Sequence, residues 1–165
     1  MYEIRGENMN SEIQIRFIEG TAIDSRIIRW QTRAWCSHVE AILPGEKTLG
    51  ALFNGGVAIR NFSDKCYRDV KRWEDWHIPC EQYQATNFYS FLHDQIGKPY
   101  DWRAIISFAL GERDWQAKGS WFCSEFMFAG MKEAGLYTPP AQLPSDRLTP
   151  RDSYLIFTGL PETWK

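Results

Sequence analysis

The first half of the chain alternates between apolar and polar residues in short runs, a pattern typical of half-buried strands. The runs that predict strands are residues 13–20, 33–43, 48–53, 56–62 and 75–79. Asn54-Gly55 separates two of these runs and favours a tight hairpin. Residues 63–75 are charged and irregular, and we expect no regular element over most of them.

One helix is expected among the strands, at residues 21–32. Asp24 or Ser25 would cap its N-terminus, because a short polar side chain there can accept a hydrogen bond from the first turn. Ile27, Ile28 and Trp30 are its candidate core contacts.

The second half changes to the 3.6-residue spacing of amphipathic helices. Helices are predicted at residues 81–97, 102–110, 120–136 and 149–157, with a loop at 111–119. Gly97 and Gly135 end two of them, Asp101 is placed to cap the helix at 102–110, and Pro150 suits the first turn of the last. Because strands come first and helices second, the chain predicts an α+β fold with a mostly antiparallel sheet.

The length of 165 residues favours a single domain over residues 1–165, with residues 1–11 as a frayed polar tail. A net charge of -2 without a basic block argues against nucleic acid as the main partner. No apolar run predicts a membrane span or a secretory signal. We therefore expect a cytoplasmic protein with no integral membrane segment and with reduced cysteines rather than a disulfide framework.

His38 and Glu40 lie two residues apart in an expected strand, so both side chains point to the same face. A carboxylate in that place can accept a hydrogen bond from one ring nitrogen and leave the other nitrogen free as a base. The same spacing fits two solvated residues on an edge strand. The pair alone leaves both interpretations open.

Cys123 stands in the aromatic segment 121–126, WFCSEF. In the first turn of a helix, unpaired amides and the helix dipole would favour a thiolate and could hold an oxyanion. Glu125 would oppose this if its carboxylate lay close to the thiol. The aromatic neighbours fit an inert thiol in the core equally well.

Taken together, a cysteine at a helix start and a strand that bears His and an acid form the arrangement of nucleophile, base and orienting residue. A rival interpretation is a zinc site. Its ligands would be the thiols and imidazoles of Cys36, His38, His77 and Cys80. Neither of their spacings matches a standard zinc finger, and such a site would leave residues 121–126 without a role.

In order and spacing, these motifs resemble the NlpC-type papain-like cysteine hydrolases in their circularly permuted branch, the YiiX-like group related to lecithin:retinol acyltransferase-like proteins. In that branch the His-bearing strand precedes the Cys-bearing helix. The matching segments are SHVE at 37–40, GKPYDW at 97–102, WFCSE at 121–125 and LTPRD at 148–152. The resemblance covers residues 13–157 and implies a papain-like domain with the Cys helix packed on an antiparallel sheet.

By position, the resemblance implies that Cys123 is the nucleophile, His38 the general base and Glu40 the residue that orients His38. The residues expected to line the oxyanion or substrate site are Tyr100, Trp121 and Ser37. Tyr100 and Trp121 are equally compatible with a place in the core.

The implied activity is hydrolysis of an amide bond, in a peptide or a cell-wall peptide, through a thioester on Cys123 and without a cofactor. Two alternatives stay open: a lipid acyltransferase or thioesterase that uses the same Cys-His pair, and a non-catalytic papain-like domain that binds a partner. The substrate would be a peptide, a peptidoglycan fragment or an acyl lipid. The absence of a basic amphipathic helix favours hydrolysis. A cell-wall hydrolase without an export signal would need another delivery route, such as lysis by a phage or prophage that encodes it.

Overall fold

A computed structural model describes residues 11–103, 119–137 and 148–159. Its centre is a five-stranded antiparallel sheet in the order β4-β3-β2-β1-β5. The strands are β1 (Ser11–Gly20), β2 (His38–Leu43), β3 (Lys47–Leu52), β4 (Gly56–Asn61) and β5 (Val70–Cys80). The predicted α+β class, the antiparallel sheet and the hairpin at Asn54-Gly55 are confirmed.

Two strand boundaries differ from the prediction. β5 begins at Val70 and pairs with β1 along its length, where an irregular segment and a short strand were expected. It is an edge strand with one outward face, so its charged residues remain in solvent while Trp76 and Ile78 enter the core. β2 begins at His38 because the chain first leaves helix α1 through Arg33, which adopts a left-handed conformation with φ 53°.

The described helices are α1 (Ile23–Thr32), α2 (Gln82–Asp94), α4 (Cys123–Glu133) and α5 (Pro150–Thr158). Each falls within or close to a predicted helix. The capping prediction for α1 is wrong: Ala22 is the N-cap, and Asp24 lies in the first turn. Trp30 is also not a core contact, since it is 74% exposed, whereas Ile28 is buried.

Several expectations fall wholly or partly on residues outside the described ranges. They are the polar tail before Ser11, residues 111–118 of the expected loop, and residues 104–110 of the helix expected at 102–110. The start of that helix is described, and Asp101 caps it as predicted, because its Oδ1 accepts a hydrogen bond from the Arg103 amide at 3.1 Å.

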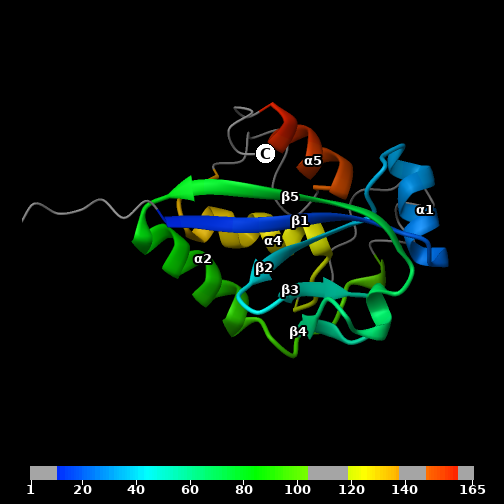
Figure 1. The fold of residues 1–165 in the computed structure, drawn as a ribbon, viewed down its shortest axis with the longest axis horizontal. Helices are drawn as coiled ribbons and strands as arrows, with labels where there is room; N and C mark the ends of the chain where they lie inside the picture. The colour runs from blue at the N-terminus through cyan, green and yellow to red at the C-terminus, as the bar shows by residue number, and fades with distance from the viewer. Residues whose placement is uncertain (1–10, 104–118, 138–147, 160–165) are drawn as a thin grey trace, which may run out of the picture.

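Helices α2 and α4 cover one face of the sheet (Figure 1). They approach each other at Gly130 of α4, where a Cβ atom would lie 3.0 Å from Leu92 and 3.1 Å from Phe88. The core between helices and sheet contains Ile13, Ile15, Phe17, Val39, Ala41, Leu49, Phe88, Leu92, Phe126 and Met127. The start of α4 is therefore pressed against the strands that carry the candidate chemistry.

The turn at residues 97–100 connects three parts of the fold. The Gly97 amide donates to the Val57 carbonyl of β4, and the Val57 amide donates back to the Lys98 carbonyl, both at 2.9 Å. Tyr100 then forms a parallel bridge with Trp121, just before α4. Gly56 makes this approach possible, because a Cβ atom there would lie 2.3 Å from the Lys98 oxygen.

Candidate active site

Cys123 is the first residue of α4, and its side chain is buried. Phe122 is the N-cap, with extended backbone angles that let the chain turn from the 97–100 region into the helix. The first intrahelical bond joins the Phe126 amide to the Phe122 carbonyl at 2.9 Å. The amides of Cys123 and Ser124 therefore precede the ladder of helical hydrogen bonds, in the position where helices bind anions.

The two polar residues that follow Cys123 both act on the backbone. The Ser124 hydroxyl is buried and donates to the Leu148 carbonyl, which ties the start of α4 to the segment before α5. Glu125 turns back, and its Oε2 accepts from the Phe122 amide at 3.3 Å. Its charge thus complements the positive end of the helix dipole.

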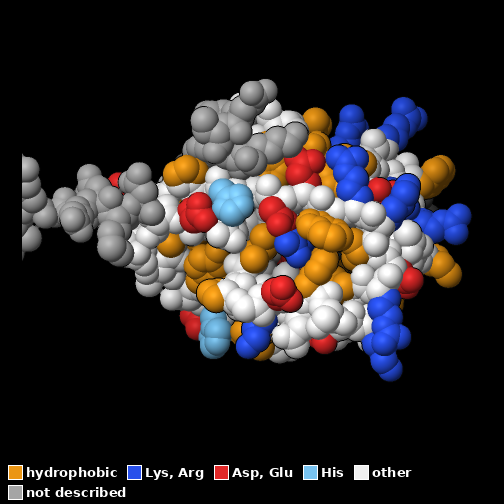
Figure 2. All heavy atoms as spheres, in the orientation of Figure 1, with side chains coloured by type: hydrophobic (Ala, Val, Ile, Leu, Met, Phe, Trp, Pro, Cys, Tyr) orange, Lys and Arg blue, Asp and Glu red, His pale blue; other side chains and the backbone are white. Residues whose placement is uncertain are grey.

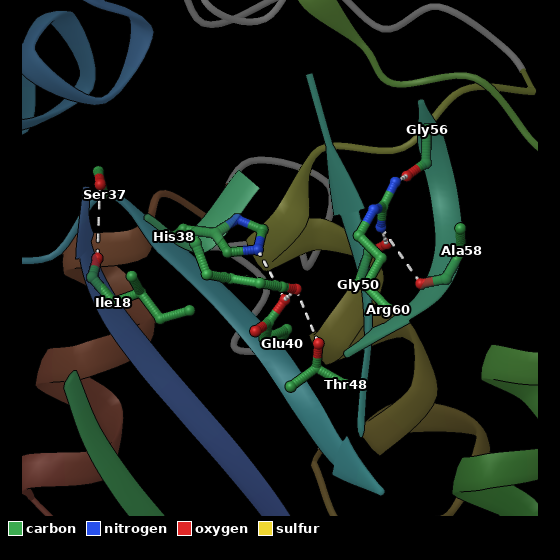
Figure 3. A network of polar contacts seen from close by, with 10 residues as sticks. Ile18, Ser37, His38, Glu40, Thr48, Gly50, Gly56, Ala58 and Arg60 are labelled. Atoms are coloured by element: carbon green, nitrogen blue, oxygen red, sulfur yellow. Dashed lines mark hydrogen bonds and ion pairs between the residues drawn. The ribbon is translucent and has the colours of Figure 1, made fainter. Parts of the chain in front are cut away.

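His38 and Glu40 lie on the same face of β2, as the alternation predicted (Figure 3). The His38 Nε2 atom is 3.2 Å from Glu40 Oε2, and both side chains are buried. The nearest residues in sequence, Val39 and Ala41, face the core instead. Short-range alternation thus separates the polar pair from the packing residues on a single strand.

His38 also forms a side-chain hydrogen bond with Cys123. Burial by itself would lower the pKa of His38, but the hydrogen bonds with Cys123 and Glu40 outweigh it and raise that pKa to about 10. The ring is therefore protonated at neutral pH, and a cationic ring favours the thiolate form of a neighbouring cysteine.

Gly50 of β3 leaves the space that Glu40 occupies. A Cβ atom on Gly50 would lie 2.7 Å from Glu40 Cβ, 3.1 Å from Glu40 Oε2 and 3.5 Å from His38 Nε2. The Gly50 carbonyl is held by Arg60 Nη1 at 3.1 Å, and the same guanidinium also bonds the carbonyls of Ala58 and Gly56 (Figure 3). The hairpin of β3 and β4 thus fixes the surface against which the carboxylate rests.

The sequence analysis missed Tyr67, which lies in a short 3-10 helix, η1 (Lys65–Tyr67). Its hydroxyl donates to Glu40 Oε2 at 2.8 Å and lies 2.7 Å from the Thr48 hydroxyl of β3. Both Tyr67 and Thr48 are buried. The only sequence signal was an aromatic residue inside the charged stretch 63–75, and that signal does not indicate its partner.

Tyr100 is the expected lining residue that does come close to Cys123. Burial first, and then the negative charge of Cys123, raise the pKa of Tyr100 well above 10. Its hydroxyl therefore keeps its proton at neutral pH and can act as a hydrogen-bond donor. The ring packs against Phe122 and Phe53, with centroids 5.8 and 6.1 Å away.

Trp121 and Ser37 have their contacts elsewhere. The Trp121 ring packs on Phe91 and Phe126, and its Nε1 donates to Gln95 Oε1 at 3.3 Å. The Ser37 hydroxyl donates to the Ile18 carbonyl at 3.4 Å (Figure 3). It also accepts from the Gly20 amide at 3.1 Å. The contacts of Trp121 connect α2 with the start of α4, and those of Ser37 connect the end of β1 with the start of β2.

The other cysteines differ from Cys123 in their surroundings. Cys36 is buried and donates to the Pro150 carbonyl at 3.5 Å, and burial together with the charge of Cys123 raises its pKa to about 12. Burial also raises the pKa of the Cys80 thiol. The side chain of Cys66 lies outside the described part of the chain. Cys36 and Cys80 are accordingly poor nucleophiles at neutral pH.

The proposed zinc ligands do not gather. His77 pairs with Glu12 at 3.0 Å on β1 and β5, while His38 pairs with Glu40. Among the residues that the structure describes, no three His, Cys, Asp or Glu side chains are grouped as a metal site would require.

A cavity of about 680 Å³ reaches His38 from one end of the molecule. Its walls come from α1, the end of β3, η1 and the start of β5. The apolar lining residues are Ile18, Ile23, Ile27, Leu52, Phe53, Val70 and Trp102. A second hollow, of about 420 Å³, is lined by Tyr100 and shares Phe53 and Trp102 with the first. The two hollows therefore lie beside the His38 and Tyr100 sides of the site.

Comparison with protein-family models and with curated proteins found no match to this sequence. The resemblance described above rests on the residues themselves. Over the described ranges, no helix is both long enough and apolar enough to cross a membrane.

Proposed function

We propose that this protein is a cysteine hydrolase with Cys123 as nucleophile, His38 as general base and acid, and Glu40 as the residue that orients His38. One observation carries the proposal: His38 has both Cys123 and the buried Glu40 carboxylate as side-chain hydrogen-bond partners. This is the geometry that nucleophilic catalysis by a thiol requires.

The reaction would proceed in two steps. In the resting pair the His38 ring already holds the proton, and the Cys123 thiolate attacks the substrate carbonyl carbon. The cationic ring then gives that proton to the leaving amine, and the acyl group remains on sulfur as a thioester. Water deprotonated by the now neutral His38 hydrolyses the thioester and restores the pair of thiolate and cationic ring. As donors to the oxyanion we propose the first amides of α4 and the Tyr100 hydroxyl.

The bond we propose to be cleaved is an amide, in a peptide or a cell-wall peptide. Two hollows beside the site, one at His38 and one at Tyr100, support a substrate that extends to both sides of the scissile bond. Lys98 and the turn at 97–100 line the second hollow, which would receive the leaving group.

A second candidate is hydrolysis or transfer of a lipid acyl group, and the apolar lining of the larger cavity favours it. Lys and Arg side chains also gather around the end of the molecule where α1 lies (Figure 2). An apolar chamber with cationic residues nearby suits an amphiphile with an anionic head. Chemistry at Cys123 would be the same, and only the acyl donor and acceptor would differ.

A third candidate, the non-catalytic binding domain, is favoured by the complete burial of Cys123, whose side chain is 0% exposed. Catalysis requires that the thiol become accessible when substrate enters. Selective labelling of Cys123 in solution would therefore distinguish an enzyme from a domain whose thiol only fills space.

The central test is alkylation by iodoacetamide near neutral pH, followed residue by residue by mass spectrometry. Cys123 should react at least about tenfold faster than Cys36 and Cys80, because a cationic neighbour favours its thiolate while burial disfavours theirs. His38→Ala should abolish the difference. His77→Ala, which removes an exposed imidazole far from the site, is the matched control.

Equal labelling of all cysteines, or unchanged selectivity in His38→Ala, would contradict the proposal. The substrate class is then decided by incubating the protein with a pool of peptides, muropeptides and acyl lipids. The mass of the adduct trapped on Cys123 distinguishes a peptidyl from a fatty acyl group.

A further inference from the structure

The Glu40 carboxylate is held in an unusual position for a charged group. Its side chain is 0% exposed, and among the residues that the structure describes Oε1 has no hydrogen-bond partner. A buried polar group is costly unless it is hydrogen-bonded, so the donors that reach the other oxygen hold this side chain in place. Those donors, both on Oε2, are His38 Nε2 and the Tyr67 hydroxyl.

The direction of the hydrogen bonds follows from counting protons. Tyr67 has one hydroxyl proton, and it goes to Glu40. In the contact with Thr48, Tyr67 is then the acceptor and Thr48 the donor. The result is an ordered chain from Thr48 to Tyr67 to Glu40, and the carboxylate in turn accepts from His38. Each bond in such a chain polarises the next.

Packing fixes the Tyr67 ring in this place. It stacks on Phe62, with centroids 4.8 Å apart. Phe62 is in turn held by Trp73, at 5.3 Å, and by the Arg16 guanidinium 4.3 Å from the ring centroid. Arg16 is itself fixed by a bidentate bond to Asp75, with distances of 2.6 and 2.7 Å. A ring this constrained can hold a hydroxyl in one direction.

We propose that Tyr67 is a positioning residue of the site, whose hydroxyl holds Glu40 Oε2 against His38 Nε2, with Thr48 fixing the direction of the bond. This inference rests on the proposed function, because it assigns Tyr67 a role through the same Glu40 and His38. Tyr67 does not contact the reacting atoms in this role.

Other ionisable groups around the pair must be considered in any test by pH. Cys123 of α4 faces His38, and Arg60 of β4 binds the carbonyl of the neighbouring Gly50. The groups that line the cavity beside His38 and Tyr67 are Asp24, Lys65 and Asp69. Tyr67→Phe removes none of these groups.

The test is Tyr67→Phe, which deletes one oxygen and preserves the stacked ring. Without its second donor, Glu40 supports the cationic form of His38 less well, so the His38 titration followed by NMR should move down by about one pH unit. Labelling of Cys123 near neutral pH should be slower in the same variant, because a less firmly held cationic ring supports the neighbouring thiolate less well. At a pH high enough for the thiolate to form unaided, the rates should converge.

Thr48→Val should give a smaller change in the same direction, and Thr48→Ser should restore wild-type behaviour. The matched control is Tyr89→Phe, which removes another part-buried hydroxyl that bonds to the sheet, through Gln14 and Ile42, away from the site. If Tyr67→Phe does not fold, the comparison of Thr48→Val with Thr48→Ser tests the proposal instead. A general structural defect would slow labelling equally at every pH, and that result would overturn the proposal.

The two proposals fail in different ways. Selective labelling of wild-type Cys123 together with an unmoved His38 titration in Tyr67→Phe would overturn the role of Tyr67 alone. Absence of selective labelling in the wild type would overturn the proposed function. The NMR titration of His38 does not require activity, and with three histidines in the chain its signal can be assigned by substitution of His77 and His93.

Discussion

At the scale of residues, the candidate site is a set of buried polar side chains that hydrogen-bond to one another. His38 has Cys123 and Glu40, and Glu40 has Tyr67. A buried charge is costly unless donors or opposite charges compensate it. This explains why the pKa of His38 rises to about 10 although its burial acts in the opposite direction.

Tyr100 gives a prediction at this scale. Tyr100→Phe keeps the packing on Phe53 and Phe122 and removes only the hydroxyl. If that hydroxyl donates to the oxyanion, kcat on the substrate identified by trapping should fall by about a hundredfold with KM little changed. The rate of Cys123 labelling should stay the same, because alkylation forms no oxyanion.

The measurement is steady-state kinetics of Tyr100→Phe beside the labelling assay. An unchanged kcat would assign Tyr100 to the core and leave the first amides of α4 as the oxyanion donors. Phe53→Leu is a useful control, since it alters the packing of the ring and keeps the hydroxyl.

At the scale of elements, two segments bring the chemistry together. The β3–β4 hairpin supplies Thr48, Gly50 and the Arg60 brace behind Glu40. The turn at 97–100 is bonded to β4 on one side and to Trp121 on the other, so it sets where α4 begins. The turn thus fixes the start of α4, while His38, at the start of β2, pairs with Ile18 of β1.

Gly50→Ala tests the hairpin. The new methyl group would lie 2.7 Å from Glu40 Cβ, an atom close to the backbone that cannot swing away. We expect a loss of about 1–3 kcal/mol in the free energy of unfolding, and a His38 titration moved to lower pH because Glu40 is displaced. Urea denaturation and NMR measure the two effects.

Gly159→Ala is the matched control, because its Cβ would meet ordinary contacts at 3.5 Å or more. Equal stability of Gly50→Ala and the wild type would show that β2 and β3 can separate at this point. In that case the close approach of Gly50 would not be what positions Glu40.

At the scale of the whole molecule, the site lies where the sheet, α4 and the segment before α5 meet. Leu148 accepts from Ser124, and Pro150 accepts from Cys36, so the region beside Cys123 is closed by the last described helix. Cys123 and Phe122 are almost completely buried. The stability of the fold and the ionisation of the site are therefore linked.

That linkage predicts a dependence of stability on pH. The pKa of His38 is about 10 in the folded protein, against an ordinary value of 6.5. The contribution of the protonated ring is complete below the unfolded pKa and is lost as pH rises through the folded pKa. The free energy of unfolding of the wild type should therefore fall toward that of His38→Gln as pH rises from about 6.5 to about 10.

Urea denaturation of both proteins at several pH values measures this difference. His38→Gln lacks the titrating ring and keeps every other titrating group. The difference in unfolding free energy between the two proteins therefore reports the contribution of the His38 ring. A difference between the two proteins that stays constant across the range would contradict the pKa of His38 and, with it, the ionised pair.

The sequence alone determined much of the fold and part of the site. Alternation placed His38 and Glu40 on one face of a strand, Asn54-Gly55 located the hairpin, and helical spacing placed Cys123 near a helix start. These features depend on residues close together in the chain, where periodicity and turn chemistry act. Charged edge strands do not follow that pattern, which is why the extent of β5 was not predicted.

Only the tertiary structure decided which residues complete the site. Tyr67 reaches Glu40 across 27 positions of sequence, and Ser124 reaches Leu148 across 24. It also placed Tyr100 near enough to Cys123 for the charge of the thiol to act on it, and it gave Trp121 and Ser37 hydrogen bonds to Gln95 and Gly20. Such contacts arise from the packing of elements against one another, and a periodic pattern fixes the face on which a side chain lies but not the partner that it meets there.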